Sequence, residues 1–270
     1  MVGLSRVVIN KEIGETPLIA IERFRITKPE LLGVPLTYAG RLDPMAHGKL
    51  LVLIGEECKK RDQYNKLDKE YEFEILLGVK SDTGDILGLI ETTLQNEILN
   101  EDRVKSILSS FVGSHEFAYP VFSSKTVNGK PLFQYAHENK LDEIEIPKRK
   151  STIYRFLYDG IYTLSTLQLL EQVKEKINKL EIDPTKTMPG SDFRKDEILA
   201  KWGEILRGET KLFTVLKFKT IVSSGTYIRT LAPLIAEKLG TLGLAYSIKR
   251  TKIGRYVSLT KRFGFWSQSF

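Results

Sequence analysis

The feature that most constrains the fold of this chain is the order of its strand-like and helix-like segments, which do not alternate regularly. Short apolar or alternating runs at 6–10, 50–54 and 71–77 have the pattern of strands. A helical pattern at 16–24 separates the first two runs, and helical spacing returns only after residue 100. This order predicts an α+β fold with a mixed, mostly antiparallel central sheet flanked by helices, and it disfavours a doubly wound parallel sheet.

Helix ends in the second half of the chain are marked by capping residues. Asn100 is placed to cap a helix that stops near Gly113, and Gly240 is placed to end another. Further helices are expected at 132–137, 164–180, 195–207 and 226–239, and strands at 212–223. Two stretches indicate loops instead, an Asp- and Gly-rich segment at 82–88 and a Pro- and Gly-containing linker at 183–192.

Composition excludes several classes of protein. Cys58 is the single cysteine, so an internal disulfide framework is excluded, and the three histidines show no spacing typical of zinc ligands. No glycine-rich phosphate loop follows a strand, which disfavours a nucleotide cofactor. No apolar run approaches the roughly 20 residues needed to span a bilayer, and the N-terminus lacks a secretory pattern. We therefore expect a cytoplasmic protein without metal, cofactor or membrane contact.

The chain is basic, with a formal net charge of +7, which suits a polyanionic partner such as RNA. Basic residues cluster in two places, at 59–61 and near the C-terminus. The C-terminal cluster contains Lys249, Arg250, Lys252, Arg255, Lys261 and Arg262. Charge alone is equally compatible with a solvated basic face and with an RNA footprint.

Residues 40–48, Gly-Arg-Leu-Asp-Pro-Met-Ala-His-Gly, lie between a loop and an apolar strand, where functional side chains are often presented. Taken alone, this segment is compatible with a simple turn that Asp43 caps and Pro44 rigidifies. Three more segments, at 69–88, 120–133 and 224–231, follow it in the order of the motifs of one family. Together they resemble the TruB family of pseudouridine synthases, the last segment, Ser-Gly-Thr-Tyr-Ile-Arg-Thr-Leu, most closely.

The resemblance implies a pseudouridine synthase fold and a set of site residues. It places Asp43 on the catalytic aspartate, Tyr71 on the active-site tyrosine and Arg229 on the active-site arginine. Substrate-binding positions are implied at Tyr38, Arg41, Lys59, Asp85, Tyr227, Ile248, Lys249 and Arg250. For Tyr71 and Ile248, ordinary core packing is the alternative interpretation.

Physical chemistry favours a contact between Asp43 and Arg229. Burial raises the pKa of a carboxylate, whereas a neighbouring guanidinium lowers it by about 1 to 3 units. Arginine suits this task better than lysine because its planar fork can hold a carboxylate at two points. We therefore expect the two side chains to meet, although they lie far apart in the sequence.

The function implied by the resemblance is isomerisation of a flipped-out uridine in RNA, with a uridine of the tRNA T-arm as the expected target. Extruding the base costs a few kcal/mol, which aromatic and basic side chains can recover. The reaction needs no metal or organic cofactor, and the protein is expected to act as a monomer. Two alternatives stay open: an RNA-binding or tRNA-folding module with reduced or no activity, and a synthase that acts on a different RNA.

Some positions depart from the family pattern. Tyr38 occupies the place of a usual histidine, and Arg41 forms an Arg-Leu-Asp triplet similar to that of the RluA and RsuA families. Residues 1–262 are expected to form a single catalytic domain with a helical insertion at about 164–210, and residues 263–270 a C-terminal tail. A C-terminal PUA-type RNA-binding domain, which many relatives have, is not expected.

Overall fold

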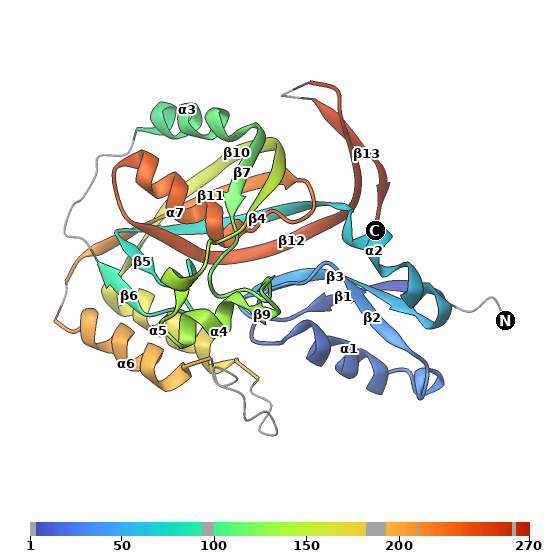
Figure 1. The fold of residues 1–270 in the computed structure, drawn as a ribbon. Coiled ribbons are helices and arrows are strands. Elements are labelled where there is room, and N and C mark those ends of the chain that lie inside the picture. Colours follow the sequence, from blue (N-terminus) through green and yellow to red (C-terminus); the bar gives the residue numbers. More distant parts are fainter. Residues whose placement is uncertain (1–3, 93–99, 182–192, 209, 261–262) are drawn as a thin grey trace.

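The computed structural model describes residues 4–92, 100–181, 193–208, 210–260 and 263–270, and a long mixed sheet runs through it (Figure 1). The strands lie in the order β1-β3-β12-β4-β11-β10-β7, with β2 also paired to β3 and β13 to β12. Their bounds are β1 (Arg6–Lys11), β2 (Leu36–Ala39), β3 (Ala46–Ile54), β4 (Asp68–Leu77), β7 (Gly113–Ala118), β10 (Lys148–Ser165), β11 (Leu212–Val222), β12 (Gly243–Ser258) and β13 (Gly264–Ser269). Only the β3–β12 pair is parallel among these described strands, which confirms the α+β prediction.

Helices cover both faces of the sheet because its central strands are apolar on both sides. In β4, Phe73 and Ile75 belong to one hydrophobic cluster, whereas Leu76 belongs to the other. Helices α3 (Glu101–Phe111) and α7 (Ile228–Leu239) complete the first cluster, and α5 (Thr166–Asn178) and α6 (Lys195–Ile205) the second. The two clusters lie on opposite faces because successive side chains of a strand point in opposite directions.

Most predicted elements are confirmed. Helix α1 (Pro17–Ile26) is capped by Thr16, and α3 is capped by Asn100 as expected. Helix α7 ends at Gly240, whose φ of +87° is the left-handed conformation that glycine adopts easily. The segment at 164–210 contains α5 and α6. The linker expected at 183–192 lies outside the described residues.

Two long strands, β10 and β12, escaped prediction, as did the role of the C-terminal segment. Both strands carry several charged residues, and three bulges or irregularities in β12 pairing interrupt its alternation. The segment expected to be a tail at 263–270 is not separate from the sheet, because β13 pairs with β12.

The turn that contains Asp43 lies where two strands share one edge of β3. Strand β12 runs along Ala46–Gly48, whereas β2 pairs with the later residues of β3, from Leu51 to Ile54. Gly48 has a φ of +101°, and a Cβ atom there would lie 2.4 Å from the Arg250 carbonyl oxygen. Glycine thus allows β12 to approach, and residues 40–45 span the point where β2 and β12 diverge.

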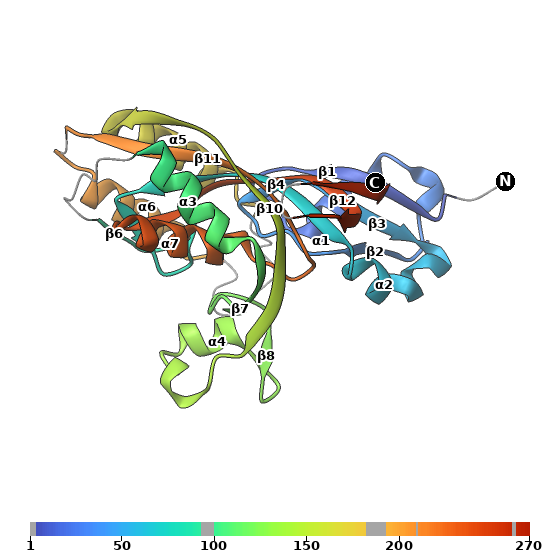
Figure 2. The same ribbon diagram turned by 90° about the horizontal axis from the view of Figure 1, so that it is seen from above.

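A small lobe follows β7 and projects away from the sheet (Figure 2). It contains β8 (Thr126–Val127), β9 (Lys130–Pro131), α4 (Leu132–His137) and the 3-10 turn η3 (Leu141–Glu143). The remaining described elements are β5 (Val79–Ser81), β6 (Ile90–Thr92), α2 (Arg61–Asn65), η1 (Pro29–Leu31) and η2 (Gly55–Lys60). Across the described ranges, no helix combines the length and apolar character needed to cross a membrane.

Candidate active site

Asp43 and Arg229 meet, as the sequence predicted. Asp43 lies in the turn between β2 and β3, and Arg229 lies in the first turn of α7. The Arg229 Nε atom donates a hydrogen bond to Asp43 Oδ2 at 2.7 Å, across 186 residues of sequence. The Arg229 side chain is 5% exposed and the Asp43 side chain 25%, so the carboxylate is reachable from solvent while its partner is buried.

Asp85 is a second carboxylate on the same arginine. Its Oδ2 atom lies 3.5 Å from Arg229 Nε, and its Oδ1 atom accepts hydrogen bonds from the Thr83 hydroxyl and the Leu87 amide. Burial raises the pKa of Asp85, and the nearby charge of Asp43 acts in the same direction, while Arg229 opposes both. Asp85 is 4% exposed, contacts Arg229 from within the protein and lines a cavity, and its expected role in binding substrate stays a prediction.

Arg229 is fixed by further contacts to the backbone. Its Nη1 atom donates to the Thr83 carbonyl at 2.9 Å, and Nη2 donates to the Phe122 carbonyl at 3.3 Å. Burial favours the neutral form, but the charges of Asp43 and Asp85 outweigh it and raise the pKa of Arg229. The guanidinium therefore remains a cation, and its position is set by three separate segments of the chain.

Two other buried cations hold the backbone around Asp43. The Lys11 Nζ atom donates to the carbonyls of Pro44 at 3.2 Å and Ala46 at 2.6 Å, and burial lowers the pKa of Lys11 to about 8. Arg250 donates to the carbonyls of Gly40 at 3.0 Å, Arg41 at 3.4 Å and Lys49 at 2.7 Å. The turn is thus fastened on both sides of Asp43.

The burial of Arg250 corrects its place in the predicted basic surface cluster. The residue is 1% exposed, and its guanidinium donates to backbone carbonyls. It contributes to a cavity wall, and its expected contact with substrate stays a prediction. Its neighbour Lys249 is exposed, because adjacent residues of β12 point to opposite sides.

Two cavities adjoin at Asp43. The first, which we name the strand-side cavity, has a volume of about 540 Å³ and is lined by Tyr71 and Ile248 from the sheet. The second, the loop-side cavity, has a volume of about 450 Å³ and is lined by Asp85, Arg229 and residues of loops. Four residues line both cavities: Arg41, Leu42, Asp43 and Tyr227. The Asp43 carboxylate is therefore accessible to ligands from either side.

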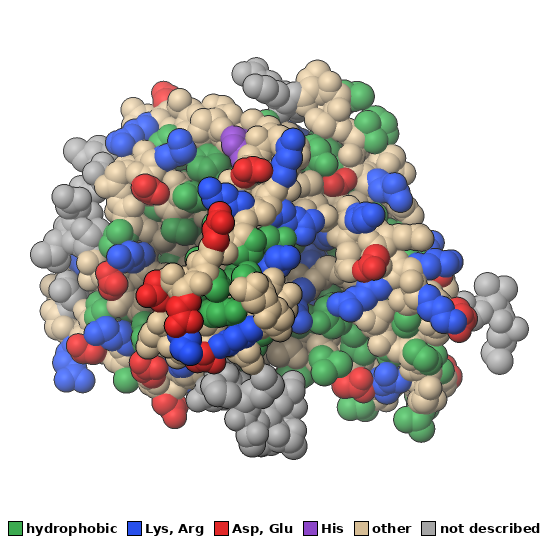
Figure 3. Space-filling view, viewed as in Figure 1, with side chains coloured by type: hydrophobic (Ala, Val, Ile, Leu, Met, Phe, Trp, Pro, Cys, Tyr) green, Lys and Arg blue, Asp and Glu red, His purple; other side chains and the backbone are tan. Residues whose placement is uncertain are grey.

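The strand-side cavity is rich in positive charge. Lys66, Lys69, Arg149 and Arg250 contribute to its lining, and Figure 3 shows Lys and Arg side chains around the hollow in the middle of this face. Burial, and then the charge of Arg250, lowers the pKa of Lys69 to about 7. Tyr71 and Ile248, at 7% and 5% exposure, give this cavity apolar surfaces. This combination suits a planar base attached to an anionic backbone.

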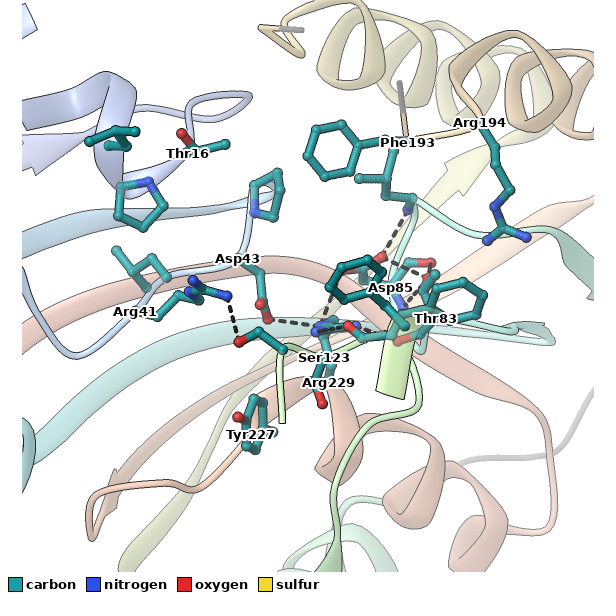
Figure 4. A pocket seen from close by; sticks show the side chains of 18 of the residues that line it. Thr16, Arg41, Asp43, Thr83, Asp85, Ser123, Phe193, Arg194, Tyr227 and Arg229 are labelled. Atoms are coloured by element: carbon teal, nitrogen blue, oxygen red, sulfur yellow. Dashed lines mark hydrogen bonds and ion pairs between the residues drawn. The ribbon is translucent and has the colours of Figure 1, made fainter. Parts of the chain in front are cut away.

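The loop-side cavity is more aromatic. The Arg41 Nη1 atom donates to the Ser124 hydroxyl at 2.6 Å, and its Nη2 atom donates to the Tyr38 hydroxyl at 3.4 Å. Tyr227 packs edge-on against Tyr119, with ring centroids 5.8 Å apart, and burial raises the pKa of Tyr227. Figure 4 shows Asp43 between Arg41 on one side and Arg229 on the other.

Two predicted site residues lie away from both cavities. The Lys59 side chain is 76% exposed and pairs with Glu56, and Lys249 is exposed on β12. Neither contributes to the lining of the two cavities. Lys261 and Arg262, from the same predicted basic cluster, lie outside the described residues.

Several residues at the site were not singled out from the sequence. Lys69 and Thr83 fell within a matched segment but received no role, although their place in the motif was the available signal. Lys11 stands where the family has an early Lys-Pro-x-Gly motif, whereas three others carried no signal in the sequence: Arg149, Phe193 and Arg194. Among the described residues, no group of three or more His, Cys, Asp or Glu side chains could hold a metal ion.

Comparison with known families agrees with this geometry. The model for "TruB family pseudouridylate synthase (N terminal domain)" matches residues 34–170, which is half of the chain. The chain therefore belongs to the TruB family.

The relatives with curated names are called tRNA pseudouridine synthase B. The chain is 29% identical to the protein of Caldicellulosiruptor saccharolyticus over 91% of this chain and 66% of that protein. It is 28% identical to the Bacillus subtilis protein over 95% of this chain and 67% of that protein. The chain thus spans about two thirds of the length of these relatives.

A solved structure shares the fold. One chain in the "Crystal Structure of a Cbf5-Nop10-Gar1 Complex" aligns with a TM-score of 0.52 and 17% identity, covering 93% of this chain and 49% of that chain. This likeness supports the architecture, a mixed central sheet flanked by helices, as the pseudouridine synthase fold.

Proposed function

We propose that this chain isomerises a flipped-out uridine in RNA to pseudouridine, with Asp43 as the catalytic carboxylate. The observation that carries the proposal is the position of Asp43, bound through Oδ2 by a buried arginine at the junction of two cavities. Among the described residues, no donor contacts Oδ1, which leaves this oxygen for a ligand. Membership of the TruB family supports the same chemistry.

Arg229 has two roles in this proposal. Its positive charge stabilises the ionised form of Asp43 in a partly desolvated site, and its contacts fix the direction in which the carboxylate points. Asp85 in turn holds Arg229 from the buried side. The carboxylate is thus oriented before the substrate arrives, which lowers the cost of reaching the reactive geometry.

The reaction balances without any co-reactant. The N1–C1′ glycosidic bond breaks, the uracil turns, and C5 joins C1′; C5 then loses a proton while N1 gains one. A carboxylate in contact with the nucleoside can form a transient bond to it or accept a proton from it. Tyr71 and Ile248 supply apolar surfaces on which the uracil ring can lie during this rearrangement.

We further propose that the target lies in the T-arm of tRNA. The names of the curated relatives support tRNA as the substrate, and the family resemblance of four ordered segments implies the T-arm. The cations of the strand-side cavity, including Lys66 and Arg149, are placed to contact the phosphates that flank an extruded nucleotide. An RNA loop meets this requirement because its bases are already partly unstacked.

The test uses purified protein, unmodified tRNA transcripts and mapping of pseudouridine at single-nucleotide resolution. Wild type is expected to modify one T-arm uridine, and Asp43→Asn to lower the rate by at least about 10²- to 10⁴-fold while binding the same transcript. A transcript with cytidine at the modified position is the substrate control.

The outcomes separate the alternatives. Binding by wild type without product on tRNA or on a panel of other cellular RNAs would support an RNA-binding or tRNA-folding module instead. Product on another RNA, with none on tRNA, would keep the chemistry and replace the target. An active Asp43→Asn variant would remove Asp43 from the reaction.

A further inference from the structure

The far wall of the loop-side cavity comes from the segment between β10 and β11. Phe193 and Arg194 directly precede α6, and both line this cavity together with Asp43. Figure 4 shows them on the opposite side of the cavity from Thr16 and Arg41. The segment expected only as a helical insertion therefore contributes two side chains to the cavity that Asp43 also lines.

The backbone of these two residues is strained. Phe193 has a φ of 56° and Arg194 a φ of 55°, which is the left-handed region that non-glycine residues seldom adopt. Two such residues in succession persist only where surrounding contacts hold them, and such strain gathers at functional sites. The conformation turns the chain into α6 while placing both side chains at the cavity.

The contacts of Arg194 hold this conformation. Its Nη1 atom lies 2.7 Å from Asp82 Oδ2, and its guanidinium carbon lies 4.6 Å from the centre of the Phe122 ring. Asp82 belongs to the loop that carries Asp85, and Phe122 begins the segment that leads into the small lobe. Arg194 thus joins three parts of the chain at one edge of the cavity.

The lining matches an unpaired nucleobase. Phe122, Phe133 and Phe193 give the cavity aromatic surfaces on which a base can stack, and stacking tolerates any base because each has a π-face. The Ser123 hydroxyl also lines the cavity, is buried, and has no hydrogen-bond partner among the described residues. A buried hydroxyl without a partner is costly, so a polar base edge is a fitting occupant.

We propose that Phe193 is a stacking surface for an unpaired base next to the target uridine, and that Arg194 is the positioning residue for Phe193. The inference rests on the proposed function, since it takes RNA as the substrate. The target uracil occupies the strand-side cavity against Tyr71, and the neighbouring base enters the loop-side cavity on the other side of Asp43. The helical segment thereby helps to select RNA in which two adjacent bases are unpaired.

The test compares Phe193→Ala, Phe193→Leu and Phe193→Tyr in the full chain. Loss of a base–aromatic stack weakens binding by about 5- to 150-fold, so the Ala and Leu variants should show a KM raised within that range. Their kcat should change little, and Phe193→Tyr should retain the wild-type KM. Phe265→Ala removes a half-exposed aromatic ring on β13 and is the matched control, with no change expected.

A spectroscopic readout tests stacking directly. A transcript carries 2-aminopurine beside the target nucleotide, and its fluorescence is measured on binding to Asp43→Asn protein, for which slower product formation is expected. Quenching is expected with Phe193 and with Phe193→Tyr, and loss of quenching with Phe193→Leu. For Arg194→Ala we expect the same rise in KM at constant kcat, and no further loss in the double variant with Phe193→Ala, because both act on one contact.

The results distinguish this inference from the function on which it rests. Unchanged KM and unchanged quenching in Phe193→Leu, with an active wild type, would overturn the stacking role and leave the enzyme intact. Conversely, a wild type without activity whose binding and quenching still depend on Phe193 would retain the RNA contact and overturn the synthase function.

Discussion

The two cavities that meet at Asp43 are built in different ways. The strand-side cavity takes Tyr71 and Ile248 from β4 and β12, whose pairing fixes the height and direction of each side chain. The loop-side cavity takes its walls from the turn at 82–88, the start of the small lobe and Phe193. Rigid strands suit the invariant part of a reaction, whereas loops can vary with the RNA that is held. The strands thus supply the apolar surfaces of one cavity, and loops supply most of the walls of the other.

The charges of the two sides differ as well. On the strand side, basic side chains outnumber acidic ones in the lining. Lys66, Lys69 and Arg149 are among the basic residues, whereas the carboxylates of this lining are Asp43 and Asp62. On the loop side, Arg229 is shared by Asp43 and Asp85. The strand side is therefore suited to phosphates, and the loop side to a neutral base.

The largest effect is expected at the residue that joins both sides. Arg229→Met leaves Asp43 and the buried Asp85 without their cation, and breaking a buried ion pair on one side costs about 3 to 5 kcal/mol. We expect that loss in the free energy of unfolding, measured by urea denaturation, together with loss of pseudouridine formation. Folding would be expected to recover in the double variant with Asp85→Asn, without recovery of activity. A stable and active Arg229→Met protein would contradict this account of the site.

The site residues that could be predicted from the sequence are those that lie in the matched motifs. Asp43, Tyr71 and Arg229 stand in ordered motifs, so their joint presence at one site could be expected from resemblance, and their positions now agree with it. Their catalytic roles stay predictions. The same resemblance carried no information on Phe193, which lies in a segment outside the matched motifs.

Arg250 shows why the remainder could not be predicted. With β12 unrecognised, Lys249 and Arg250 were grouped as one surface cluster, whereas neighbouring residues of a strand point to opposite sides. Irregular register in β12 hides its alternation, and the partners of Arg250 are carbonyls from distant turns. Long-range hydrogen bonds of this kind leave no trace in local sequence spacing.

Substitutions of the adjacent residues Arg250 and Lys249 should differ in their effects on stability and on RNA binding. Arg250→Met removes hydrogen bonds from a charged group to the turn that carries Asp43, so we expect a loss of roughly 2 to 3 kcal/mol in stability and a lower kcat. The salt dependence of RNA binding should be the same for the Arg250→Met variant as for wild type. Lys249→Met should change stability by less than about 0.5 kcal/mol. If Lys249 contacts a phosphate, its loss reduces the logarithmic salt slope by about 0.7 to 0.9. Equal stability loss in both variants would contradict the difference in burial.

A pH-dependent effect concerns Lys69, the buried lysine of the strand-side cavity. Its pKa in the folded state is about 7, lowered by burial and by Arg250, against 10.5 for the free side chain. Between these values the folded state binds fewer protons than the unfolded state, so stability should rise with pH from about 7 to 10.5, by at most about 1.4 kcal/mol per pH unit. Lys69→Met should lack this rise in urea denaturation, whereas the exposed Lys59→Met should keep it.

The same titration changes the charge of the cavity. Below about pH 7, Lys69 gains a proton and adds a positive charge beside Arg149 and Arg250, which attracts RNA phosphates. RNA affinity of wild type should therefore increase as the pH falls through 7 by more than that of Lys69→Met, when both are measured at constant ionic strength. If the affinities of the two proteins change with pH in parallel, the RNA phosphates lie away from Lys69. Arg149, which lines the same cavity, would then be the next cation to test.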